Sequence, residues 1–102
     1  MELSEPQKKY LRGRGHQLKP TVTIGNAGVT ESVLAELDST LAHHELIKVK
    51  VRAGDRESRD AAIRSMCDAQ NATLVQRIGS VALLYRENPD KKPETRLRIP
   101  SR

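Results

Sequence analysis

Residues 21–30 read TVTIGNAGVT, so a short apolar strand, a Gly-x-x-Gly turn and a helix start follow one another. The β-branched run at 21–24 is typical of a strand, and Thr30 is a residue type that caps helix N-termini. Glycine carries no Cβ, so a phosphate group can approach the backbone N–H groups of such a turn and of the following helix. The turn is therefore the candidate site for holding a nucleic-acid backbone, and its residues are Gly25, Asn26, Ala27 and Gly28.

The segments on either side of this stretch predict a small α/β domain. Ser4 and Gln7 have the form of a capping box, Gly13 and Gly15 are expected to end the first helix, and Gly79 with the next residue predicts a II′ hairpin. Because strand–helix–strand units place their strands parallel, we expect a two-layer α/β sandwich with a small mixed four-stranded sheet and helices mainly on one face. The expected order is helix 5–13, strand 21–24, helix 30–44, strand 46–52, helix 55–69, strand 72–78 and strand 81–86.

Residues 46–52, LIKVKVR, alternate between apolar and cationic side chains. Alternate residues of a strand point to opposite faces, so the apolar residues face the core and Lys48, Lys50 and Arg52 face away from it. With two or three helices to cover the sheet, its other face is expected to stay open to solvent. That open face is a second candidate contact surface.

Positive charge is concentrated at the two ends of this chain of 102 residues, whose net charge is +5. Residues 1–24 and residues 88–102 each carry five Lys or Arg against two acids, whereas residues 25–87 carry eight against nine. Basic ends favour a polyanionic partner, although they also serve solubility alone. We expect one domain over residues 1–87 and a flexible basic tail over residues 88–102, which are rich in charge and proline.

Cysteine usage and hydropathy favour a cytoplasmic location for this protein. No apolar run approaches the roughly 20 residues that a membrane span needs, and no apolar leader is visible. The single cysteine, Cys67, has no partner for an internal disulfide. We therefore expect a cytoplasmic protein with no membrane contact.

Aromatic content separates two ways of binding RNA. Tyr10 and Tyr85 are the only aromatic residues, so stacking of bases on sheet aromatics, as in RRM modules, cannot be the main mechanism. A KH-type module, which grips the sugar-phosphate backbone with a G-x-x-G loop, is the closer analogue. Four basic residues that precede the turn are expected to help, with a merely solvated face as the alternative: Arg12, Arg14, His16 and Lys19.

No catalytic or metal-binding constellation is visible. His43 and His44 lack further ligands nearby, and Cys67 shares an apolar helix face with Ile63, as a small core residue does. The nucleotide-binding motifs G-x-G-x-x-G and G-x-x-x-x-G-K-[ST] are missing. We expect no enzyme activity, no cofactor, no metal and no small-molecule substrate.

Three segments resemble the CRM domain (chloroplast RNA splicing and ribosome maturation), whose stand-alone bacterial members are the YhbY-like proteins. They are GHQLKP and IGNAGVT within residues 15–30, HHELIKVK at 43–50, and VQRIG at 75–79 with LYR at 84–86. The resemblance implies a fold similar to the C-terminal domain of bacterial translation initiation factor three. It also implies RNA binding through the loop at 25–28, with neighbouring basic positions at Arg12, Lys19, Lys48 and Lys50, and association with precursors of the large ribosomal subunit.

The expected function is that of a monomeric, non-catalytic RNA-binding protein in ribosome assembly, with ribosomal RNA as the partner. Two alternatives belong to other classes. One is a protein-interaction adaptor that docks an acidic protein on the open sheet face through Lys48, Lys50 and Arg52. The other is an RNA-modifying enzyme, for which no nucleophile, metal set or cofactor motif is visible.

Overall fold

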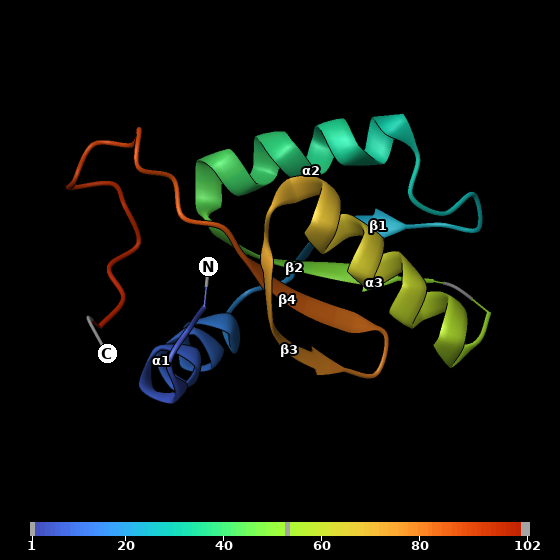
Figure 1. The fold of residues 1–102 in the computed structure, drawn as a ribbon, viewed down its shortest axis with the longest axis horizontal. Helices are drawn as coiled ribbons and strands as arrows, with labels where there is room; N and C mark the ends of the chain where they lie inside the picture. The colour runs from blue at the N-terminus through green and yellow to red at the C-terminus, as the bar shows by residue number, and fades with distance from the viewer. Residues whose placement is uncertain (1, 53, 101–102) are drawn as a thin grey trace.

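The computed structural model describes residues 2–52 and 54–100 of the chain. Figure 1 shows the expected order of elements. These are α1 (Glu5–Gly15), β1 (Pro20–Ile24), α2 (Glu31–His44), β2 (Leu46–Val51), α3 (Arg56–Gln70), β3 (Thr73–Ile78) and β4 (Val81–Tyr85). The predicted order is confirmed, and the predicted boundaries are close to those observed.

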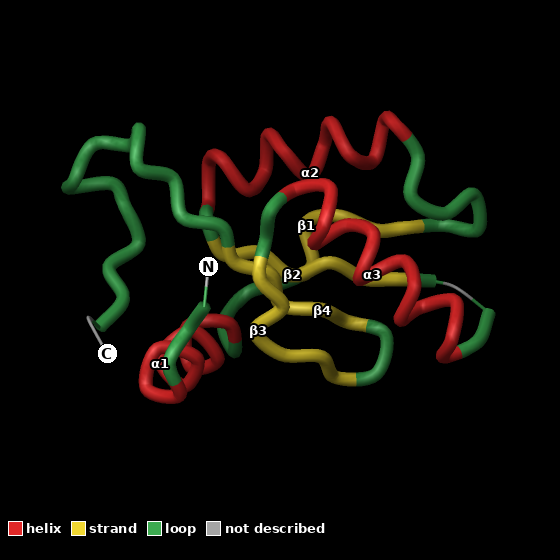
Figure 2. The backbone as a smooth tube through the Cα atoms, viewed as in Figure 1, coloured by secondary structure: helices red, strands yellow, loops and turns green. Residues whose placement is uncertain are grey.

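The strands form one mixed sheet in the order β1-β2-β4-β3. β1 and β2 are parallel, whereas β4 is antiparallel to both of its neighbours. Figure 2 shows α2 and α3 packed along the sheet, where they bury Leu37, Leu41 and Met66 against sheet residues such as Val49 and Leu84. The predicted two-layer α/β sandwich with a mixed four-stranded sheet is confirmed.

α1 lies on the other face of the sheet, which the sequence predicted to be open. Leu11 of α1 is completely buried and packs with Leu46, Leu83 and Tyr85. These sheet residues alternate along their strands with those that face α2 and α3, so they point the opposite way. The prediction of an open face is therefore wrong for the end of the sheet under α1. The reason is that this face carries large apolar residues as well as lysines, and burying the apolar residues is favourable.

α1 runs through Gly13 and ends at Gly15, so the prediction that Gly13 helps to stop the helix is wrong. Its start is as predicted, because the Ser4 hydroxyl accepts the Gln7 N–H at 3.3 Å and the Gln7 side chain accepts the Ser4 N–H at 2.9 Å. A glycine inside a helix costs only about 1 kcal/mol, which packing on the sheet outweighs. Gly15 marks a close approach, since a Cβ there would lie 2.7 Å from Leu83 Cδ2.

The remaining turns follow the local chemistry of the sequence. Thr30 caps α2 by accepting the Val33 N–H at 3.2 Å. Asp55 caps α3 by accepting the Ser58 N–H at 2.7 Å, and this hydrogen bond lowers the pKa of the Asp55 carboxyl. The tight hairpin between β3 and β4 is confirmed, with Gly79 at the positive φ of +58° that the first residue of a II′ turn requires.

Residues 88–100, here called the C-terminal segment, form no helix or strand but return toward α1 (Figure 1). Leu97 and Ile99 pack against the cluster under α1. The Gln7 side chain donates to the Pro100 carbonyl at 2.8 Å. This segment is the one expected as a flexible tail, and its flexibility stays a prediction beside these contacts.

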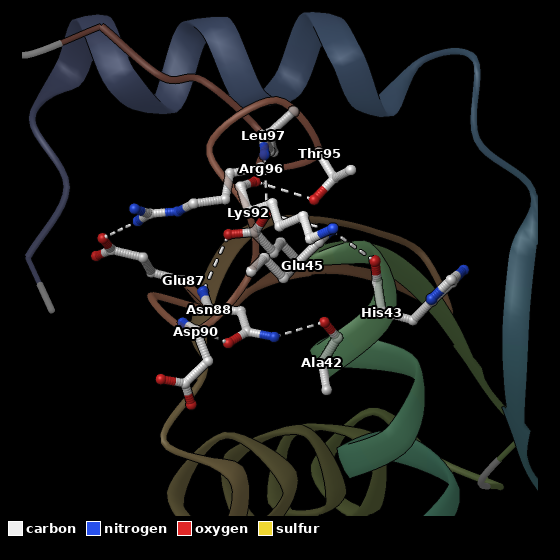
Figure 3. Close-up of polar contacts among 11 residues, drawn as sticks. Ala42, His43, Glu45, Glu87, Asn88, Asp90, Lys92, Thr95, Arg96 and Leu97 are labelled. Atoms are coloured by element: carbon white, nitrogen blue, oxygen red, sulfur yellow. Dashed lines mark hydrogen bonds and ion pairs between the residues drawn. The ribbon is translucent and has the colours of Figure 1, made fainter.

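A buried carboxylate binds the C-terminal segment (Figure 3). Glu45 follows α2, has no exposed surface, and is held at a φ of +65°. Its Oε2 accepts the Asn88 N–H at 3.0 Å and its Oε1 accepts the Leu97 N–H at 2.8 Å. The Lys91 ammonium lies 3.6 Å from Oε1. Glu45 therefore joins the end of α2 to positions at both ends of a ten-residue stretch of the segment.

The phenol of Tyr85 provides a titration test of this packing. Burial, with the nearby carboxylates of Glu45 and Glu87, raises the pKa of Tyr85 from 10.0 to about 12. The neutral phenol is the form that fits the fold, so its contribution to stability is intact below pH 10 and is lost as the pH rises from 10 to about 12. Subtracting the phenolate absorbance of Tyr85→Phe from that of the wild type should give a midpoint near 12, and a midpoint at 10 would contradict the buried position.

Candidate nucleic-acid interface

The Gly-x-x-Gly loop projects from the end of β1 into solvent (Figure 1). Gly25, Asn26 and Ala27 are exposed, and a hydrogen bond of 3.0 Å from the Gly28 N–H to the Gly25 carbonyl closes the turn. Gly28 has a φ of +78°, which favours glycine, and no atom lies within 4 Å of a Cβ placed on Gly25. Within residues 2–52 and 54–100, no backbone partner engages the Asn26 and Ala27 N–H groups. These N–H groups are available to an oxygen of a ligand.

The start of α2 is a weaker anion site than the sequence predicts. The Thr30 side chain already accepts the Val33 N–H, and the Glu31 carboxylate stands in the first turn. A negative side chain at a helix N-terminus interacts favourably with the helix dipole and would repel an incoming phosphate. The loop N–H groups are therefore the stronger part of this site.

Two cations, one in β2 and one directly after it, lie beside the loop. Lys50 is paired in register with Thr23 near the end of β1. Arg52 follows β2, and its backbone N–H donates to the Ile24 carbonyl at 2.9 Å, next to Gly25. Arg52 is exposed and Lys50 is half-buried. The positive charge beside the loop thus comes from β2 and the residue that follows it, and Lys50 is one of the basic positions that the family resemblance implies.

The cations that precede the turn in sequence lie at the far end of β1. Arg12 and Arg14 are in the last turns of α1, His16 is its C-terminal cap, and Lys19 directly precedes β1. A strand of five residues separates them from the loop, a span of roughly 16 Å at about 3.3 Å per residue. Arg14 faces a hollow that His44 also lines. The structure therefore does not bring Arg12 or Arg14 to the loop.

A hollow of about 230 Å³ lies on the part of the sheet face that α1 leaves uncovered; we call it the sheet hollow. Its apolar residues come from β3 and β4, and Lys48, His16 and the Gln76 amide supply its polar groups. Lys48 is paired in register with Pro20, which also lines the hollow. Lys48 therefore lies at the sheet hollow and Lys50 lies nearer the loop on the same strand, β2.

The remaining histidine and cysteine residues of the described ranges form no metal site. The His43 and His44 rings meet edge to face at 4.5 Å, and burial raises the pKa of the Cys67 thiol, as expected of a packed cysteine. Within the described ranges, no group of three or more His, Cys, Asp or Glu side chains could hold a metal ion. Nor does the described part of the chain contain a helix with the length and apolar character of a membrane span.

Sequence reasoning named His16 and Lys48 but missed the residues of β3 and β4 that line the sheet hollow, and it missed the role of Glu45. The missed residues come from β3 and β4, and the end of α1 also lines the hollow. They are Gln76, Ile78, Val81 and Leu83. The one local signal is Ile78, a large apolar residue beside the hairpin turn that is 65% exposed. Glu45 gives no such signal, because an acidic residue at a helix end is most often solvated.

Comparisons with known proteins agree with this architecture. The model of the CRS1 / YhbY (CRM) domain matches residues 3–86. A probable RNA-binding protein of Pseudomonas aeruginosa is 45% identical over 97 residues, which cover 95% of this chain and 91% of that protein. An RNA-binding protein of Haemophilus influenzae is 46% identical over 90 residues, covering 88% of this chain and 91% of that protein.

A solved structure shows the same fold. The solution structure of a hypothetical protein of Staphylococcus aureus, described as a candidate RNA-binding protein, superposes with a TM-score of 0.77 at 35% identity. The superposition covers 95% of this chain and all of that one. With the family model matched from the start of α1 to the end of β4, the chain is a member of the CRS1/YhbY (CRM) domain family.

Proposed function

We propose that this protein binds RNA through its Gly-x-x-Gly loop and catalyses no reaction. The observation that carries the proposal is the loop itself, which is exposed and free of bulky side chains. Among the residues that the structure describes, none provides a backbone partner for the Asn26 and Ala27 N–H groups. Membership of the CRM family and the names of the bacterial relatives support RNA as the polyanion.

In this mechanism the loop makes the close contact with the RNA. Lys50 of β2 and Arg52 directly after β2, here called the strand cations, supply the long-range attraction. The N–H groups of Asn26 and Ala27 donate to a phosphate oxygen, and Lys50 and Arg52 lie beside the same point of the chain. Phosphate contacts position a nucleic acid without reading its sequence, so specificity rests mainly on RNA shape. Affinity should fall steeply as salt rises.

We further propose that the RNA is ribosomal and that the protein acts as a cytoplasmic monomer on precursors of the large ribosomal subunit. The support is the resemblance of the loop and of residues 43–50 to the CRM pattern. Tagged protein in a gradient of cell extract should sediment with precursor large subunits and be released by nuclease. Sedimentation only at the position of free protein would contradict this assignment.

Acidic residues in the loop test the main proposal. Asn26→Asp combined with Ala27→Asp should weaken binding of a short single-stranded RNA about tenfold, because each new charge at about 7 Å from a phosphate costs roughly 0.6 kcal/mol in water. Fluorescence anisotropy at low salt measures the dissociation constant. Circular dichroism should show an unchanged fold, since both positions are exposed.

A matched control carries the same change of net charge away from the loop. Ser39→Asp combined with Ser65→Asp places the two acids on exposed positions of α2 and α3. This variant should lose less than threefold in affinity. Equal losses in the two double variants would show that only net charge matters and would remove the loop from the proposal.

A further inference from the structure

We propose that the sheet hollow binds one unpaired nucleobase of the RNA whose backbone the loop holds. The inference rests on the proposed function and adds a second contact of different chemistry. The loop and the strand cations address phosphates, whereas the hollow offers an apolar surface with a polar rim. RNA recognition commonly targets single-stranded bases that are splayed out of a stack, which is what such a hollow accepts.

The apolar surface of the hollow is suited to the flat face of a base. Ile78 is 65% exposed, while Leu83, which also lines the hollow, is only 3% exposed. A volume of about 230 Å³ corresponds to several water molecules at about 30 Å³ each. Replacing that water with a base removes apolar surface from solvent, which is favourable.

The rim supplies groups that match the edge of a base. The Gln76 amide offers both a donor and an acceptor, Lys48 offers donors only, and the His16 imidazole offers one of each when neutral. The residues that line the hollow include no Asp or Glu. The surroundings are therefore neutral to positive, which suits a nucleotide and disfavours the basic side chains of a protein partner.

The placement of the hollow relative to the loop allows one strand of RNA to reach both. Lys50 is paired with Thr23 near the loop, and Lys48 is paired with Pro20 at the hollow. Pro20 and Gly25, the first loop residue, are separated by the length of β1, roughly 16 Å at about 3.3 Å per residue. A backbone that passes from the loop along Lys50 and Lys48 thus arrives at the hollow with its phosphates beside cations.

The test compares two oligomers with equal numbers of phosphates: a short oligouridylate and an abasic-spacer oligomer that carries no bases. Wild-type protein should bind the oligouridylate about tenfold tighter, because covering the apolar surface of the hollow with a base is favourable. Ile78→Ser should reduce that ratio to about twofold with little change in affinity for the spacer oligomer. The matched control is Leu74→Ser, which removes the other large apolar residue that is exposed in residues 2–52 and 54–100. Leu74 is also on β3 but lies beside α3 residues such as Ile63 and Cys67.

Each outcome bears on a different part of the proposal. Equal affinity of the wild type for both oligomers would overturn the base contact while leaving backbone binding intact, and no binding of either oligomer would overturn the proposed function itself. A tenfold ratio that persists in both Ile78→Ser and Gln76→Ala would place the base contact elsewhere and overturn this assignment. Gln76→Ala gives the same readout should Ile78→Ser prove unfolded by circular dichroism, because it leaves the apolar residues in place.

Discussion

Glu45→Gln should lower the free energy of unfolding by about 3 kcal/mol, a large effect for an isosteric change, because hydrogen bonds to a buried charged group contribute about 1.5–3 kcal/mol each. Both carboxylate oxygens accept a backbone N–H, from Asn88 at 3.0 Å and from Leu97 at 2.8 Å. A glutamine must turn its NH₂ group toward one of these donors, which leaves that donor unsatisfied. The Lys91 ammonium also loses its carboxylate partner at 3.6 Å and keeps only its hydrogen bond of 2.7 Å to the His43 carbonyl.

The same substitution should cost less than about 1 kcal/mol in a chain that ends at Glu87. That chain lacks all three groups that contact the carboxylate, and water can reach the side chain once the C-terminal segment is gone. Urea unfolding followed by circular dichroism measures the change in the free energy of unfolding that Glu45→Gln causes in each chain. The difference between the two changes is the coupling energy between Glu45 and the C-terminal segment. Glu36→Gln, at an exposed position of α2, is the matched control and should change stability by less than about 0.5 kcal/mol.

A flexible tail predicts a different result. If the C-terminal segment does not stay in contact with the folded domain in solution, Glu45→Gln should leave the free energy of unfolding nearly unchanged in both chains. Lys91→Met in the full chain gives an independent reading, because it leaves the carboxylate buried with its charge partner removed. Near-neutral values for both substitutions would contradict the docked C-terminal segment.

The backbone at Glu45 explains why these contacts matter to the fold. A non-glycine residue at a φ of +65° costs of order 1–3 kcal/mol and persists where surrounding contacts over-determine it. Here the Glu45 N–H donates to Leu41 at 2.8 Å and its carbonyl accepts the Arg86 N–H at 2.8 Å, while the side chain binds the C-terminal segment. The turn from α2 into β2 is therefore held by the last turn of α2, by the residue that follows β4 and by the C-terminal segment.

The parts of the fold that the sequence predicts are those decided by neighbouring residues. The capping box at Ser4, the cap at Thr30 and the hairpin glycine at Gly79 each act within four residues, so the types and order of the elements follow from local chemistry. The exposed loop at Gly25 is local in the same sense. Its neighbours in space are not local, because the strand that supplies them is more than twenty residues later in the chain.

The parts that the sequence does not predict depend on distant residues. Leu97 meets Glu45 across 52 positions, and no periodicity in either segment signals that meeting. The hairpin at Gly79 predicts that β3 pairs with β4, but no local feature of the sequence identifies β2 as the other neighbour of β4. The position of α1 is of the same kind, since it is fixed by how closely one glycine approaches the sheet.

Gly15→Leu should destabilise the fold by about 2–3 kcal/mol. Gly15 is buried, and even a Cβ there would lie 2.7 Å from Leu83 Cδ2, so the larger side chain must displace either Leu83 or the end of α1. Leu83 is only 3% exposed and cannot move freely, and overpacking of this kind costs about 1–3 kcal/mol. Urea unfolding gives the measurement.

Gly13→Ala is the matched control and should have the opposite sign. No atom lies within 4 Å of a Cβ at Gly13, which is inside α1, so alanine should stabilise the protein by about 0.5–1 kcal/mol. Adding Leu83→Ala to Gly15→Leu should restore more than 1 kcal/mol, because the shortened side chain makes room for the new one. Equal effects at Gly13 and Gly15 would mean that both act only through helix propensity, and the close approach that sets α1 beside the sheet hollow would be wrong.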